Sequence, residues 1–147
     1  MSTATLSELL RRPNQIISQT EKGAVTITRR DGADLLIMKA EDERRRREGV
    51  NLASAIMRAA VAAGGDFAAA LATVFGWTRL LTSRELESFA QDVEKSLWAA
   101  VDLDRYELFL LEVGRWSATA ETYAAGLPRG DGADQQWLDR SSAVARP

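Results

Sequence analysis

The sequence predicts an α+β protein in which a small helix-and-hairpin unit is followed by a long helix and a helical module. Two observations predict this fold class. Between residues 24 and 38, apolar and polar side chains alternate with the period of a β-strand, Asp31-Gly32 offers a chain reversal, and a second apolar strand follows. From Lys39 to about residue 126, apolar residues instead recur at the helical spacing of three and four.

The segment before the hairpin predicts a helix from about residue 6 to residue 21. Thr5 and Glu8 have the spacing of a capping box, and Gly23 is suited to a left-handed helix end. Pro13 lies inside this helical pattern, where it lacks a backbone donor and clashes with the preceding turn. We therefore expect a kink or a break near Arg12.

The segments after the hairpin predict a small helical bundle. The helix after Lys39 begins with acids that suit its dipole, and Gly49 within it predicts a possible bend, at a cost of about 1 kcal/mol relative to alanine. Thr82 and Glu85 form a second capping box. The sequence predicts three parts: an N-terminal domain at residues 1–64, a helical module at 65–127 and a flexible tail at 128–147.

Composition narrows the classes of function. The 147 residues include no cysteine and no histidine, which removes thiolate metal sites, cysteine nucleophiles and the commonest general base. The closely spaced carboxylates, such as Glu85 with Glu87, are explained by capping and solvation. The sequence therefore predicts a protein that is not an enzyme, with no catalytic residue, no cofactor and no metal site. Because no uncharged stretch is long enough to span a bilayer, we also expect a cytoplasmic protein without a membrane partner.

Charge is distributed unevenly along the chain. Residues 1–47 carry ten Lys/Arg against seven Asp/Glu, whereas the remaining residues carry nine against fourteen. This asymmetry indicates either a polyanionic partner for the first third or ordinary scatter of surface charge. The run Arg44–Arg47 follows acids at 41–43, so ion pairs on a solvated helix surface are the favoured interpretation there.

Two other arginine pairs come from separate elements of the first unit. Arg11 and Arg12 lie in the first predicted helix, and Arg29 and Arg30 lie where the first hairpin strand enters its turn. If the helix packs on the hairpin, these four side chains could form one basic patch.

Residues 4–43 resemble the N-terminal domain of the Phd/YefM antitoxin family. The matching features are a helix that begins with Ser7-Glu8, a strand that ends Ile27-Thr28-Arg29-Arg30, an Asp31-Gly32 turn and a second apolar strand. The resemblance implies a two-fold dimer with a shared sheet, in which strand-end and first-helix residues of both protomers face operator DNA.

The resemblance also implies which residues contact DNA. Arg29 matches the strand-end arginine of the family, Arg30 is its neighbour, and Ser7 matches the polar residue at the start of the first helix. The position of the family's helix-one arginine is occupied here by Leu10, so either Arg11 or Arg12 is the candidate for that contact.

The candidate partner-binding residues are Trp116, Trp137 and Leu138. Trp116 lies at helical spacing, where core packing is the favoured interpretation, whereas Trp137 and Leu138 are the apolar residues of a polar tail. We expect an antitoxin of a type II toxin–antitoxin system that neutralises a cognate toxin by direct binding and autorepresses its operon as a dimer on operator DNA. The alternative is a helical interaction or scaffold protein whose N-terminal unit only dimerises.

Overall fold

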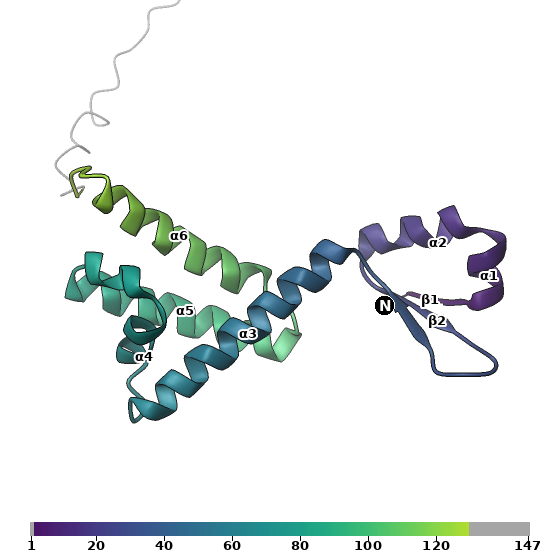
Figure 1. The fold of residues 1–147 in the computed structure, drawn as a ribbon, viewed down its shortest axis with the longest axis horizontal. Coiled ribbons are helices and arrows are strands. Elements are labelled where there is room, and N and C mark those ends of the chain that lie inside the picture. Colours follow the sequence, from purple (N-terminus) through teal and green to yellow (C-terminus); the bar gives the residue numbers. More distant parts are fainter. Residues whose placement is uncertain (1, 130–147) are drawn as a thin grey trace, which may run out of the picture.

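The computed structural model of the protein describes residues 2–129, in two units joined by one long helix, α3 (Figure 1). Of the tail predicted at 128–147, residues 130–147, with Trp137 and Leu138, lie outside the described residues. In chain order the elements are β1 (Ser2–Thr5), α1 (Leu6–Arg11), α2 (Pro13–Gln19), η1 (Thr20–Lys22), β2 (Val25–Thr28), β3 (Leu35–Ile37), α3 (Ala40–Ala62), α4 (Phe67–Val74), η2 (Gly76–Leu80), α5 (Ser83–Leu103) and α6 (Glu107–Ala124). This mostly helical chain with a small sheet agrees with the predicted α+β class.

The sheet contains a strand that the sequence patterns did not predict. β1 pairs in parallel with β2, and β2 pairs antiparallel with β3, so that β2 lies in the middle. The parallel register places Thr5 beside Thr28, and the Thr28 hydroxyl donates a hydrogen bond to the Ala4 carbonyl oxygen at 3.3 Å. The predicted hairpin is thus present as β2 and β3, but within a three-stranded sheet.

A small core lies between this sheet and the helices α1 and α2. Val25 and Ile27 of β2 are fully buried, while Thr26 and Thr28 on the opposite face are only partly buried. The alternation predicted for this strand is therefore confirmed. Ala4 and Ile16 complete the buried set, and Leu6, Leu9 and Ile37 pack against it.

The predicted first helix is divided in two at Pro13. α1 ends at Arg11, Arg12 leaves the helical conformation with φ −138°, and α2 begins with Pro13 at its first position. A proline is tolerated there because the first helical amides have no partner within the helix. The break near Arg12 is confirmed, and so is the capping box of Thr5 and Glu8.

The second unit packs α3 against α4, α5 and α6 around a larger core. Ile56 of α3, Leu71 of α4, Phe89 of α5 and Phe109 of α6 are fully buried there. Because the second half of α3 lies in this core, the two cores divide inside α3, before the predicted division at residue 64. The predicted capping box of Thr82 and Glu85 opens α5 as expected.

Gly49 has a packing role that its sequence context did not reveal. α3 runs through this position as one uninterrupted helix, and Gly49 is buried against Tyr106, at the start of α6. A Cβ at position 49 would lie 2.3 Å from the Cβ of Tyr106. Glycine is therefore needed here because the Tyr106 side chain lies directly on the helix backbone.

The arginine run that follows the start of α3 is largely paired. Arg44 and Arg45 lie within ion-pair distance of Glu41, and Arg47 pairs with Glu43, which confirms the predicted intrahelical ion pairs. Arg46 instead reaches Asp104, to which its Nε donates at 3.1 and 3.3 Å. Hydrogen bonding to Asp104 raises the pKa of Arg46.

We predict that Gly49→Ala destabilises the protein by about 1–3 kcal/mol, because the added methyl group overpacks the contact with Tyr106. Thermal unfolding followed by circular dichroism measures the effect. Gly114→Ala in α6 is the matched control, since an added Cβ there meets nothing within 4 Å. The control should raise stability by about 0.5–1 kcal/mol, as glycine is replaced by a better helix former. Equal effects of the two substitutions would contradict the packing role of Gly49.

Candidate functional site

Three of the predicted DNA-binding residues lie together around one hollow in the first unit. Ser7, Arg29 and Arg30 line a hollow of about 750 Å³ where the start of α1 meets the end of β2. Its complete lining is Thr5, Leu6, Ser7, Thr28, Arg29, Arg30 and Asp31. The structure thus brings one serine and two arginines from separate segments of the chain to one place.

The parallel pairing of β1 and β2 explains this arrangement. Thr5 and Thr28 are the last residues of their strands and lie side by side in the register. The residues that follow each strand therefore leave the sheet at the same edge, Ser7 in α1 and Arg29 and Arg30 in the loop. Thr5 and Thr28 were missed as members of the site, because Ser2–Thr5 contains a single apolar residue, Ala4, and so gives little signal of a strand.

The two arginines of the hollow are exposed, and within residues 2–129 neither guanidinium forms an ion pair. The Arg29 guanidinium lies over Gly32, where a Cβ would come within 3.2 Å of it. The backbone N–H of Arg29 donates to Asp34 Oδ1 at 3.4 Å, which closes the loop between β2 and β3. Both cationic groups are therefore available to an anionic ligand.

Glu8 places a carboxylate next to Thr5 of this hollow, and one of its oxygens, Oε2, accepts two hydrogen bonds. The Thr5 backbone N–H and hydroxyl donate to Glu8 Oε2 at 2.7 and 2.8 Å. The hydrogen bond from the Thr5 backbone, followed by that from its hydroxyl, lowers the pKa of Glu8, and Arg12 lowers it further. The charge of Glu8 is thus used to cap α1.

Arg11 and Arg12 do not line the hollow. Arg11 is the last residue of α1, Arg12 lies at the break before α2, and both are exposed. The structure therefore joins the strand-end arginines with Ser7 and leaves the helix-one pair on a neighbouring surface.

Trp116 lies within the packing of the helical module. Its ring centroid is 5.7 Å from that of Phe89, and its Nε1 donates to Asp92 Oδ2 at 3.1 Å. These contacts agree with the core interpretation of Trp116. Trp98 of α5, by contrast, is exposed to 57%.

A second cluster of ionisable groups joins the start of α5 to the end of α6. The Tyr123 hydroxyl donates to Glu85 Oε1 at 2.7 Å, and Arg129 lies over the Tyr123 ring with its Cζ 4.6 Å from the centroid. Burial raises the pKa of Glu85, but the hydrogen bonds from Thr82 and Tyr123 and the charge of Arg129 outweigh it, so the pKa is lowered overall. The hydrogen bond to Glu85 raises the pKa of Tyr123. Since each group is already satisfied by a neighbour, this cluster is structural.

We predict that Glu85 makes the helical module sensitive to acid. The pKa of Glu85 in the folded state lies below the ordinary value of 4.5. The stabilisation of the fold by ionised Glu85 is therefore fully present above pH 4.5, and it is lost as the pH falls through the folded-state pKa. Glu85→Gln should lower the unfolding temperature at pH 7 and reduce its dependence on pH below about 4.5. Glu87→Gln, an exposed neighbour, is the control. Parallel pH profiles for both variants would contradict this role.

Comparison of the chain with protein-family models, with curated proteins and with solved structures found no match. Within residues 2–129 no group of three or more acidic side chains is placed to hold a metal ion. No helix in the same range has both the length and the apolar character needed to cross a membrane.

Proposed function

We propose that this protein is a dimeric antitoxin that binds operator DNA to repress its own operon and neutralises a cognate toxin by direct binding. The observation that carries the proposal is the hollow at the edge of the sheet, where Ser7, Arg29 and Arg30 come together. The mechanism is binding alone, and no step of it requires a reacting group.

The chemistry of the hollow suits the DNA backbone. Guanidinium groups present a planar fork of donors that matches phosphate oxygens, and a serine hydroxyl adds a further donor. Contacts of this kind set the position of a protein on the duplex, while contacts to base edges supply sequence preference. Because Arg30 is adjacent to Arg29 and is also exposed, the loop offers cations to more than one phosphate or base.

Dimerisation is supported by apolar side chains that the first unit leaves exposed. Leu10, Ile17 and Leu36 are 74%, 54% and 54% exposed, and Leu35 at 45% lies on the same short strand as Leu36. A unit this small gains stability when a second copy covers such residues. A two-fold dimer would present two copies of the arginine hollow to neighbouring half-sites of an operator.

Toxin binding is assigned to the helical module and to the residues after it. Candidate contacts are Trp137 and Leu138, whereas Trp116, the third residue expected from the sequence, packs against Phe89 within the module. The module has its own core, separate from that of the first unit, so DNA binding and toxin binding can use different surfaces.

One observation favours the alternative of a scaffold whose first unit only dimerises. Asp31 lines the hollow beside Arg30, and Asp34 accepts the backbone N–H of Arg29, so acidic groups lie close to the cations. If the negative potential of these carboxylates outweighs the positive potential of the arginines, the protein would have no affinity for DNA. The exposed leucines would still hold two copies of the chain together.

We predict that replacing Arg29 and Arg30 together by alanine weakens binding to a DNA fragment from upstream of the gene. Each lost phosphate contact should also reduce the slope of log affinity against log salt by about 0.9. Fluorescence anisotropy across a series of salt concentrations, with an unrelated fragment as competitor, measures both effects. Arg84→Ala, which removes an exposed arginine of α5, should leave binding unchanged.

Wild-type protein with no preference over the competitor fragment at any salt concentration would contradict DNA recognition and favour the scaffold. A loss for Arg84→Ala about half that of the double variant would show instead that binding follows net charge and not the hollow, because Arg84→Ala removes one cation and the double variant removes two.

We predict further that Arg29→Ala still neutralises the toxin, because the helical module is separate from the hollow. Growth of cells that express the neighbouring toxin gene together with each antitoxin variant measures neutralisation. Loss of neutralisation by a folded Arg29→Ala variant would show that the two activities share one surface.

A further inference from the structure

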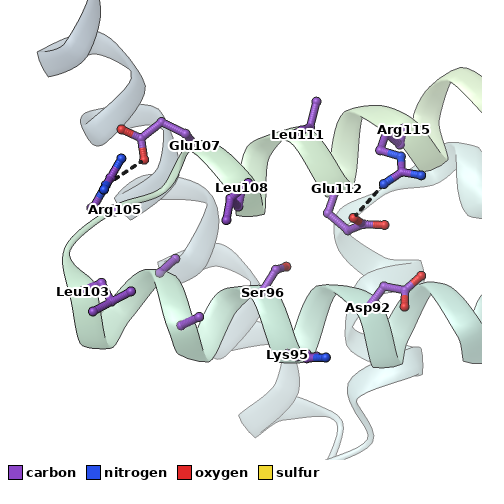
Figure 2. Close-up of a pocket in the computed structure, with 12 residues that line it drawn as sticks. Asp92, Lys95, Ser96, Leu103, Arg105, Glu107, Leu108, Leu111, Glu112 and Arg115 are labelled. Atoms are coloured by element: carbon purple, nitrogen blue, oxygen red, sulfur yellow. Dashed lines mark ion pairs between the residues drawn. The ribbon is translucent and has the colours of Figure 1, made fainter.

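A groove between α5 and α6 lies on the helical module, remote in sequence from the arginine hollow (Figure 2). Its volume is about 680 Å³. Its lining includes Leu103, Leu108 and Leu111, which are 69%, 74% and 58% exposed. Exposed leucines that share one lining are typical of a surface that other apolar side chains cover.

The ion pairs of the groove are closed within the chain. Arg105 lies 3.8 Å from Glu107 near the α5–α6 connection, and Arg115 lies 3.6 Å from Glu112 toward the other end (Figure 2). Because these charges already have partners, what the groove offers to an occupant is its leucines. The occupant must therefore carry apolar side chains.

The described chain ends beside the seam between α5 and α6. Gly126, with φ +78°, follows the end of α6 and reverses the chain. Arg129 then lies over the Tyr123 ring of α6, with its Cζ 4.6 Å from the centroid, and 3.6 Å from Glu85 of α5. Residue 130 therefore starts at the seam and not at the free end of α6.

A smaller hollow extends the groove toward this point. It shares Asp92, Glu112 and Arg115 with the groove and continues to Thr119, about one helical turn from Tyr123. A continuous surface path along the seam thus joins the place where the chain reverses to the exposed leucines.

The chain after Arg129 is long enough to follow this path. Trp137 lies eight residues beyond Arg129, which an extended chain spans over about 26 Å. Along α6, Leu111 and Leu108 lie about 18 and about 22 Å from Tyr123. An extended segment therefore brings Trp137 level with the leucines.

The side chains of this segment suit the groove as well. Trp137 and Leu138 are adjacent and are the two largest apolar side chains among residues 130–147. A tryptophan alone buries about 150–250 Å². A short tether gives an effective concentration of about 1 mM, so a contact with a dissociation constant of about 0.1 mM would be mostly formed.

We propose that the α5–α6 groove is the docking site of the C-terminal segment of the same chain, with Trp137 and Leu138 packed on Leu108 and Leu111. The segment runs along the seam from Arg129, antiparallel to α6. This docking is a property of the chain alone and does not depend on the antitoxin function. If that function holds, a toxin that binds Trp137 and Leu138 has to compete with the groove for them.

The test locates the segment in the full-length chain by NMR, without toxin or DNA. Because the chain contains no cysteine, Ser141→Cys provides a single attachment site for a nitroxide spin label, which broadens the signals of nearby amides. Docking carries position 141 past the leucines, so the loss of amide signal should be largest at residues 103–111 and smaller at 119–125. The same sample after reduction of the nitroxide supplies the reference intensities.

Two matched pairs of substitutions in the labelled protein test the contact itself. Trp137→Ser should abolish the loss at residues 103–111, whereas Trp98→Ser, which changes a 57% exposed tryptophan of α5 outside the groove, should not. Leu108→Asp should abolish the loss too, whereas Val61→Asp in α3, also outside the groove, should leave it unchanged. The amide spectrum of each variant shows whether it remains folded.

Signal loss at residues 103–111 that requires both Trp137 and Leu108 supports the docking. Loss that is largest beside Arg129, or loss at 103–111 that persists in Trp137→Ser, would overturn it. A mixture of spin-labelled protein with isotope-enriched protein that carries no spin label identifies the source of the segment. The same loss in the enriched protein of this mixture would also overturn the inference, since the segment in the groove would then come from another copy.

Discussion

The parallel pairing of β1 with β2 is the contact on which the candidate site depends. It buries Ala4 beside Val25 and Ile27, and it aligns the ends of the two strands at Thr5 and Thr28. The first helix and the arginine loop leave the sheet at the same edge for this reason. Without β1, Ser7 would be tethered to the hairpin only through α1 and α2, and no hollow would join it to Arg29 and Arg30.

Helix α3 has a comparable role between the two units. It follows β3 in the chain, and its second half packs in the core of the helical module (Figure 1). Gly49 allows Tyr106 to lie against the helix, and Arg46 holds Asp104 at the end of α5. Helix α3 therefore connects the sheet unit, which holds the arginine hollow, to the helical module, whose core is separate. This division is consistent with one protein that binds two different partners.

Local patterns predicted much of this structure. The hairpin strands, both capping boxes and the break at Pro13 follow from rules that act over a few residues, and the structure confirms them. β1 was not predicted because four small residues carry little apolar pattern and acquire a partner only through pairing distant in sequence. The close approach at Gly49 and the exposed leucines of the α5–α6 groove depend likewise on tertiary contacts. For the candidate site, the sequence predicted Ser7, Arg29 and Arg30 together with Arg11 and Arg12. Only the structure shows that the first three line one hollow and that Arg11 and Arg12 lie outside it.

The central claim is that the edge of the sheet at Ser7, Arg29 and Arg30 is the surface that meets DNA. The most direct test is an NMR titration of isotope-labelled protein with a duplex from upstream of its gene, followed at the backbone amides. If DNA binds at this surface, the perturbed amides will concentrate at residues 5–7 and 28–31, and the amides of α5 and α6 will be unaffected. Perturbations confined to the helical module, or none during titration, would contradict it.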